Sequence, residues 1–332
     1  MKLIDFKREF DKYLLTFIES KINYLPPHKN KEIAGIFKHL YAISSEGKRI
    51  RPYLAYLAFI SSGGRNKKQT LRFFVFLETF HLFCLVHDDI MDKAKTRHGL
   101  ETINSRYGNS QAILIGDLLL SWSFDNLLAN HNYQNKNVEE VRKIFLEMID
   151  EVCLGQMFDV NIGTKKKATD EEINRKIFLK TATYSFINPL RIGAALAGKR
   201  NNDFIKLGTY LGIAFQIQDD LLDVKYNVSQ TKKSSFNDVY QNQHTLLSNF
   251  IHQNGTKEQK TALGKLFGKK LNDNDKKTLK TIFRESGAIE YAEKEIYNNL
   301  NQASEILKKI KIDGEYKILF NKLISDLINR SN

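Results

Sequence analysis

The sequence contains few of the residues that build disulfide-rich or strand-rich proteins. Among its 332 residues there are two cysteines, Cys84 and Cys153, too few for a disulfide framework or a cysteine-rich metal site. Only four prolines occur, at positions 26, 27, 52 and 189, and short alternating runs between Asn-Gly turns are scarce. We therefore expect an all-α protein in a reducing location, the cytoplasm.

The chain also lacks an evident targeting or membrane-spanning segment. Residues 1–10 mix acidic with apolar residues, and no uncharged apolar stretch reaches the roughly 18 residues that a bilayer requires. We expect no transmembrane segment. A net charge of +13 suits an anionic partner, but the lysines are spread along the sequence and no nucleic-acid-binding signature accompanies them. An anionic small molecule is therefore favoured over nucleic acid.

Long stretches with helical periodicity make up most of the chain. Residues 3–20 and 31–46 are predicted as the first two amphipathic helices, and residues 256–330 return to the same periodicity. Gly47 suits the C-terminal cap of the second helix, and Pro52 suits the first position of the next. No convincing linker interrupts the sequence, so we expect a single domain over residues 1–332.

An acidic cluster closes the apolar run 73–86. Asp88 and Asp92 lie one helical turn apart on one face, Asp89 is three residues from Asp92, and His81 lies two turns before Asp88. Like charges packed beside an apolar wall repel each other and resist desolvation. Hard divalent cations relieve that repulsion, and Mg²⁺ held by one or two carboxylates plus substrate phosphates is the usual form.

A second acidic cluster of the same type follows another apolar run. Gln216, Asp219, Asp220 and Asp223 fall at i, i+3, i+4 and i+7, which is one helical face. Two matched carboxylate triplets on apolar helices are improbable by chance. They predict a site that a polyanion enters as its metal complex.

Three basic segments suit a phosphate ligand. Lys48 and Arg51 lie in a predicted turn between helices, with Arg49 between them, and the stretch 93–99 carries further cations. The turn at 47–52 could also be an exposed basic turn favoured by the dipole of the preceding helix. The third segment, 180–183, lies in a helix that Pro189 should kink, which would free backbone carbonyls near Thr181 to face a developing carbocation. Lys232 and Lys233 fall in a polar stretch predicted as a loop.

The ordered set of motifs resembles the trans-isoprenyl diphosphate synthases of the polyprenyl synthetase family. The motifs are GKRIRP (47–52), the helix of His81, DDIMD (88–92), TRHG (96–99), GDLLL (116–120), GQMFD (155–159), KTA (180–182) and FQIQDDLLD (215–223). The resemblance covers nearly the whole chain. It implies one large helical bundle around a deep central cavity, two acidic helices that face each other across its mouth, and a homodimer.

The resemblance also implies a chemistry, the Mg²⁺-dependent head-to-tail condensation of isopentenyl diphosphate with an allylic diphosphate. It implies three Mg²⁺ ions, two bound through Asp88 and Asp92 with Asp89 beside them, and one bound through Asp219 with its neighbours Asp220 and Asp223. Departing pyrophosphate would be stabilised by Arg97, Lys180 and one of Lys232 and Lys233. Isopentenyl diphosphate would lie against Lys48, Arg51 and His81, whereas Thr181 and Gln216 would line the carbocation.

Two positions depart from the family pattern. His98 stands where the family usually has a second arginine, and a histidine with a pKa of about 6.5 is only partly charged and lacks the guanidinium fork. Affinity for isopentenyl diphosphate is therefore expected to be lower or pH-sensitive. Gln243 stands where the family commonly has a lysine, so one contact with the allylic diphosphate becomes neutral.

Product length is predicted from two aromatic residues. Phe83 and Phe80 lie five and eight residues before Asp88, on the stretch that would line the cavity below the metals. In the family a bulky aromatic here marks short or medium products, and the spacing within DDIMD favours C20 over C15. The alternative is that Phe83 is simply a core residue, which would leave open a product of C30 or longer.

Two further functions remain open. A peptide-modifying prenyltransferase would not need Lys48, Arg51 and His81, because its acceptor carries no diphosphate. A non-catalytic partner subunit of a two-component synthase would not need both complete aspartate motifs. The intact residues therefore favour the synthase.

Overall fold

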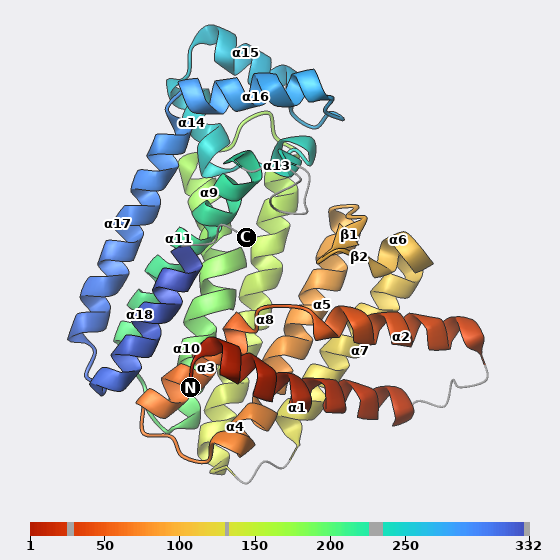
Figure 1. Ribbon diagram of the computed structural model, residues 1–332, viewed down its shortest axis with the longest axis vertical. Helices are drawn as coiled ribbons and strands as arrows, with labels where there is room; N and C mark the ends of the chain where they lie inside the picture. Colours follow the sequence, from red (N-terminus) through yellow and green to blue (C-terminus); the bar gives the residue numbers. More distant parts are fainter. Residues whose placement is uncertain (25–29, 130–132, 226–234, 329–332) are drawn as a thin grey trace. The chain divides into compact units, whose positions relative to one another are not determined.

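The computed structural model describes residues 1–24, 30–129, 133–225 and 235–328 (Figure 1). Nearly all of these residues that are in regular structure are helical. The only strands in the described ranges are β1 (Thr96–Arg97) and β2 (Leu100–Glu101), which form one antiparallel pair. The prediction of an all-α fold is thus confirmed.

The chain divides into two compact units, which we describe separately. The first comprises residues 1–142 and 192–199, and the second residues 143–191 and 200–332. The expectation of one domain over the whole chain stays a prediction. The helices α8 (Asn135–Gly163) and α10 (Asn188–Leu196) each contribute residues to both units.

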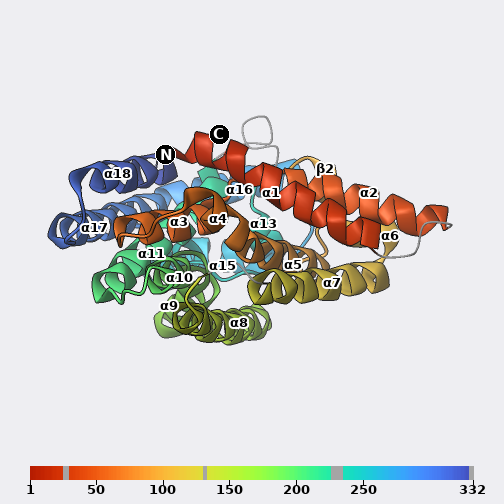
Figure 2. The same ribbon diagram turned by 90° about the horizontal axis from the view of Figure 1, so that it is seen from below.

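The elements of the first unit are mostly long helices. They are α1 (Leu3–Tyr24), α2 (Lys31–Ser45), α3 (Ile50–Ser61), α4 (Lys67–Phe73), α5 (Val75–Met91), β1, β2, α6 (Ile103–Tyr107) and α7 (Asn109–Leu128). Helix α1 packs on α3 through aromatic rings, with Phe6 lying 5.1 Å from Tyr53 and 5.3 Å from Tyr56 between ring centroids. Figure 2 shows α5 and α7 side by side.

Gly116 permits the close approach of α5 and α7. A Cβ atom on Gly116 would lie 2.1 Å from Nε2 of His87, a separation that real Cβ atoms do not adopt. The GDLLL motif therefore has a packing reason for its glycine, because a side chain there would force the imidazole of His87 on α5 to move.

The turn between α2 and α3 is held by Arg49, whose side chain is 1% exposed. Its guanidinium contacts Oε1 of Glu78 at 2.8 Å and Oδ1 of Asp11 at 2.6 Å, and it donates to the carbonyls of Ser44 and Glu46. Burial alone would lower the pKa of Arg49, but Glu78 and Asp11 outweigh burial and raise it. Arg49 is thus a buried structural cation, and the grouping of Arg49 with the diphosphate-binding cations was wrong.

The start of α3 also differs from expectation. Helix α3 begins at Ile50, so Pro52 is its third residue and not its first. The reason is that Arg49 takes the N-cap position in a left-handed conformation, with φ of 56°. Proline remains tolerated because the first four N–H groups of a helix have no partner within it.

One stretch of the described residues, Lys67–Met91, is long and apolar enough to cross a membrane by length and composition. Within its most apolar window 67% is buried inside the protein. Such burial is typical of a core helix, since α5 supplies Phe76, Leu77 and Phe80 to the interior.

The second unit is built around α11 (Asn202–Lys225). Its other elements are α9 (Asp170–Lys176), the π-helix η1 (Ile177–Ile187), α13 (Asn237–Tyr240), α14 (Leu246–Asn254), α15 (Lys257–Leu266), α16 (Asp273–Glu285), α17 (Ala288–Lys309) and α18 (Gly314–Ile328). Helix α11 packs against η1 and α17. Apolar residues of α11, α14, α16 and α17 form a buried cluster that includes Leu221, Leu247 and Phe283.

The segment that precedes Pro189 is a π-helix, and not an α-helix kinked by proline as expected. Pro189 is the second residue of α10, which continues directly from η1 at Asn188. Two glycines let neighbouring helices reach η1, because a Cβ on Gly155 would lie 2.6 Å from the backbone nitrogen of Lys180 and one on Gly212 would lie 2.4 Å from Cα of Ala182. The π-helix carries Lys180 and Thr181. Helix irregularities of this kind are often found at functional sites.

Candidate active site

The first acidic cluster lies at the C-terminal end of α5. Asp88 and Asp92 are half-buried, and the N–H of Asp92 donates to the carbonyl of Asp88 at 2.8 Å. Asp89 is buried, with 5% exposure, and accepts a bidentate pair from Arg97, whose Nε and Nη2 lie 2.9 and 2.7 Å from its Oδ1. The cluster therefore contains two carboxylates on the more open side and one carboxylate held by an arginine.

Arg97 is carried by the β1–β2 hairpin. His98 and Gly99 form its two-residue turn with φ of 53° and 82°, the pattern of a type I′ turn, for which glycine is well suited. Asn104 of α6 donates to the carbonyl of Asp89 at 3.1 Å and to that of Ala94, just before the hairpin, at 3.3 Å. The basic stretch thus has a defined backbone geometry in which Arg97 is fixed and His98 is exposed.

His81 lies among cations. Burial holds the pKa of His81 well below its ordinary value, and nearby positive charges lower it further. Those charges belong to Arg51, Arg97, Arg49 and His98. The structure therefore brings together His81, Arg51, Arg97 and His98, as a diphosphate site requires, with the imidazole neutral near pH 7. Lys48 is exposed in the turn before α3.

The second acidic cluster lies in the last two turns of α11. Asp219 is exposed, whereas Asp220 is buried and Asp223 is half-buried. Both carboxylate oxygens of Asp223 accept backbone N–H groups, from Asn237 and Asp238, each at 3.0 Å. Asp223 therefore fixes the start of α13, and Asp219 presents the accessible carboxylate.

A hydrogen-bonded chain links this cluster to η1. The hydroxyl of Thr181 donates to Oε1 of Gln216 at 2.6 Å, and Nε2 of Gln216 donates to Oδ1 of Asp220 at 2.7 Å. Thr181 and Gln216 were both predicted as site residues, and the structure places them in direct contact. Asp220 accepts the hydrogen bond from Gln216 and thereby orients the side chains of both Gln216 and Thr181.

The carboxylates of the second cluster repel each other. Burial, with Asp219 and Asp223 nearby, raises the pKa of Asp220 to about 7, although Lys176 and Gln216 oppose the shift. Burial and the charge of Asp223 also hold the pKa of Asp238 well above its ordinary value. Asp238 belongs to the same cluster, and sequence reasoning missed it because it lies on a different helix.

Lys180 lies on a buried carboxylate that was also missed. Its Nζ donates to Oδ2 of Asp159 at 2.6 Å, and Nζ of Lys176 lies 3.1 Å from the other oxygen, Oδ1. Asp159 is 3% exposed, and its pKa is lowered because Lys176 and Lys180 outweigh the effect of burial. The GQMFD motif contained this signal, since a lone aspartate in an apolar helix requires a cation.

The remaining predicted residues are placed as follows. Lys232 and Lys233 lie outside the described residues. Gln243 is half-buried, and its backbone N–H donates to the carbonyl of Asp238 at 2.7 Å. Phe80 is fully buried and stacks on Phe83 with ring centroids 5.5 Å apart. Phe83 is half-buried and also contacts His87 at 4.6 Å.

The donor set suits a hard cation that keeps other ligands. Among the described residues, no group of three or more histidine, cysteine, aspartate or glutamate side chains converges to enclose a metal. Mg²⁺ is usually bound by one or two carboxylates with phosphates and waters completing the shell. Asp88 with Asp92, and Asp219 within its repulsive cluster, have this chemistry.

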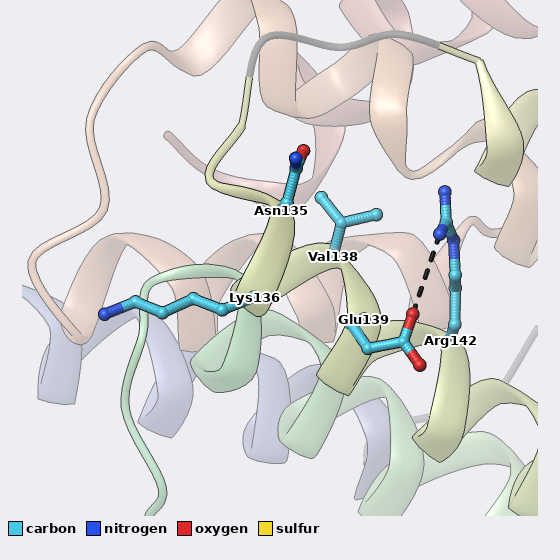
Figure 3. A pocket seen from close by; sticks show the side chains of 5 residues that line it. All are labelled: Asn135, Lys136, Val138, Glu139 and Arg142. Carbon is cyan, nitrogen blue, oxygen red and sulfur yellow. Dashed lines mark ion pairs between the residues drawn. The ribbon is translucent and has the colours of Figure 1, made fainter.

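A separate hollow of about 480 Å³ lies at the start of α8 (Figure 3). It is lined by Asn135, Lys136, Val138, Glu139 and Arg142. Glu139 and Arg142, one turn apart on α8, pair at 3.6 Å. None of the predicted site residues lines this hollow, and we assign it no part in the chemistry.

The fold and the two acidic clusters define an all-helical enzyme that handles a diphosphate. The model of the family described as polyprenyl synthetase matches residues 31–285, and the chain belongs to this family of prenyltransferases. The resemblance noted from the motifs is thereby confirmed.

Named relatives agree in activity but differ in product. The chain is 30% identical to a geranylfarnesyl diphosphate synthase of Aeropyrum pernix over 88% of this chain and 92% of the relative. It is 28% identical to a geranylgeranyl diphosphate synthase of Sulfolobus acidocaldarius over 92% and 95%. The crystal structure of geranylgeranyl pyrophosphate synthase from Corynebacterium glutamicum, complexed with isoprenyl diphosphate and magnesium, matches with a TM-score of 0.93, 25% identity, and coverage of 99% and 100%.

Proposed function

We propose that this protein condenses isopentenyl diphosphate with an allylic diphosphate, head to tail, to give a trans-prenyl diphosphate of C15–C20, with C20 favoured. The observation that carries the proposal is the pairing of each acidic cluster with phosphate-binding cations. Arg97 and Arg51, with the neutral imidazole of His81 beside them, accompany the first cluster, and Lys180 accompanies the second. A catalyst of diphosphate ionisation needs metal-binding carboxylates and cations together.

Asp88 and Asp92 would hold two Mg²⁺ ions and Asp219 a third. When bound there, Mg²⁺ would supply Lewis-acid charge that stabilises a departing pyrophosphate. Asp89, Asp220 and Asp223 contribute less directly, since they are engaged by Arg97, by Gln216 and by backbone N–H groups of α13. One domain over residues 1–332 is part of the proposal.

The chain's own residues have distinct tasks in this reaction. Arg97 and Lys180 bind the leaving diphosphate, while Lys48, Arg51 and His81 bind isopentenyl diphosphate, with one of Lys232 and Lys233 completing the leaving-group contacts. Thr181 and Gln216 present oxygen dipoles to the allylic cation, and Asp220 orders both of them. The double bond of isopentenyl diphosphate attacks the allylic carbon, and the proton lost afterwards goes to pyrophosphate.

His98 would contact the homoallylic diphosphate from the turn of the hairpin. Its positive φ and exposure agree with a residue that reaches out to a ligand. Because an imidazole lacks the bidentate fork of an arginine, affinity for isopentenyl diphosphate is expected to be lower than with an arginine at this position, or pH-sensitive. Gln243 contributes no charge.

Phe83 is proposed to limit product length, with Phe80 behind it. Phe80 is fully buried and holds the Phe83 ring by stacking. We expect Phe83→Ala to shift products to longer chains, measured by mass spectrometry of the dephosphorylated alcohols. Phe80→Ala is the contrasting variant, since emptying a fully buried site should cost about 3–5 kcal/mol of stability. An active Phe83→Ala enzyme with unchanged products would show that Phe83 is only a core residue.

A homodimer is proposed, and exposed apolar faces support it. On α8, Leu154 and Met157 are 48% and 66% exposed, and they continue a stripe with Leu146 and Val160. Contiguous exposed apolar surface is typical of an interface. We expect sedimentation to give twice the chain mass of 38.4 kDa, and Met157→Lys to give the monomer. A monomeric wild-type protein would contradict the proposal. A cytoplasmic location is proposed together with it.

The experiment that tests the function compares acceptors. Purified protein with Mg²⁺ and an allylic diphosphate should release pyrophosphate only when isopentenyl diphosphate is added. Release with a peptide acceptor instead would indicate a peptide-modifying prenyltransferase. Release only after a second subunit is supplied would indicate a component of a two-component synthase.

A further inference from the structure

Two lysines share one buried carboxylate in the second unit. Asp159 accepts Lys180 on Oδ2 and faces Lys176 on Oδ1, at 2.6 and 3.1 Å. The side chains are 4% exposed for Asp159, 12% for Lys176 and 26% for Lys180. A buried carboxylate therefore pairs with two lysines, of which Lys176 is the more buried.

The two lysines are held differently. Nζ of Lys176 also donates to the backbone carbonyl of His244 at 2.7 Å, so it is fixed to the segment before α14. Lys180 lies in η1, next to Thr181, whose hydroxyl contacts Gln216 of the second acidic cluster. Lys180 is thus the more exposed lysine and the one beside the proposed reaction site. In the proposed reaction Lys180 binds the diphosphate, whereas Lys176 pairs with Asp159.

A buried carboxylate that loses its only cation is strongly destabilised. If Asp159 had Lys180 alone, moving Lys180 to a diphosphate would leave Asp159 charged, buried and unpaired. With Lys176 in place, Asp159 keeps a counter-ion when Lys180 leaves. The positive charge of Lys176 also acts on Asp220 and Asp238, which identifies it as a resident cation of the cluster.

We propose that Lys176 is a positioning residue that stays on Asp159 and thereby lets Lys180 exchange that carboxylate for the diphosphate of the allylic substrate. The proposal rests on the proposed function for the identity of the ligand. It predicts that Lys176 affects diphosphate binding without touching the diphosphate. It also predicts that diphosphate binding requires Lys176 only when Asp159 carries its negative charge.

The test measures binding of inorganic pyrophosphate in Mg²⁺ by titration calorimetry on the full chain. Lys176→Met should weaken binding roughly 30-fold, because Lys180 is then retained by a buried carboxylate. Lys176→Arg should behave as wild type. Lys206→Met is the matched control, since Lys206 is an exposed lysine of the same unit that pairs with Asp203, and it should change nothing.

The decisive variant combines Lys176→Met with Asp159→Asn. With no buried charge to satisfy, Lys180 is available again, and pyrophosphate affinity should return toward the wild-type value. The double variant also carries the test if Lys176→Met alone does not fold. Unchanged binding in Lys176→Met, or a double variant that folds but binds no better than the single, would overturn the proposal.

Steady-state kinetics separates this proposal from the proposed function. In Lys176→Met the Michaelis constant for dimethylallyl diphosphate should rise, and that for isopentenyl diphosphate should stay unchanged. A wild-type protein that forms no prenyl product but shows the predicted pyrophosphate pattern would refute the function and leave the role of Lys176 supported. If the wild-type protein forms prenyl product and Lys176→Met binds pyrophosphate as the wild type does, the proposed function would be supported and the role of Lys176 refuted.

Discussion

Asp219→Ala should reduce turnover at least 100-fold, in proportion to the loss of roughly 3 kcal/mol or more of transition-state stabilisation, while the protein stays folded. Asp219 is exposed and its charge raises the pKa of Asp220, so removing it relieves repulsion without opening a cavity. The rate of prenyl transfer in Mg²⁺ and thermal unfolding of the same sample measure the two effects. Asp88→Ala should behave in the same way.

The matched control is Asp203→Ala, which removes an exposed aspartate from the first turn of the same helix, α11. It should leave both rate and stability unchanged. Asp89→Ala should differ from both, because it deprives half-buried Arg97 of its bidentate partner and so lowers stability as well as rate. Full activity in Asp219→Ala would show that the second cluster binds no catalytic metal.

Arg49→Met should destabilise the protein by about 3–5 kcal/mol, because it leaves Glu78 buried without its cation. Glu78 is 2% exposed and receives Nη1 of Arg49 at 2.8 Å. Chemical denaturation measures the loss. Activity per folded molecule should change little, since Arg49 has no proposed contact with either substrate.

Arg8→Met is the control for this prediction. Arg8 also pairs with an aspartate, Asp5, but both side chains are exposed, so its loss should be barely measurable. The double variant Arg49→Met with Glu78→Gln should recover part of the stability, because the uncompensated charge is removed. An Arg49→Met protein as stable as wild type would mean that the buried network contributes nothing to the fold.

The features that could be predicted from the sequence are those that depend on the local spacing of residues. The positions of Asp88 and Asp92, and of Gln216 and Asp219, follow from helical periodicity alone, and the scarcity of proline and turn signals indicated the helical fold. The hairpin turn was also within reach, since Gly99 in a short basic stretch suits a positive φ.

What could not be predicted depends on contacts distant in sequence. Whether a lysine or arginine binds substrate or supports the fold is decided by where carboxylates lie. Arg49 supports the fold because Glu78 and Asp11, both distant in the sequence, bind its guanidinium. Asp159 lies in α8 and Lys176 in α9, so their contact depends on how two successive helices pack and not on local spacing. The π-helix likewise reflects the close approach permitted by Gly155 and Gly212.

The central claim is that the enzyme extends an allylic diphosphate by five-carbon units taken from isopentenyl diphosphate. Mass spectrometry of the products from purified protein, geranyl diphosphate, labelled isopentenyl diphosphate and Mg²⁺ tests it most directly. The account predicts labelled chains that have gained one or two units, ending mainly at C20, and no product after Mg²⁺ is chelated. Geranyl diphosphate recovered without added label, from protein that is folded and saturated with Mg²⁺, would contradict it.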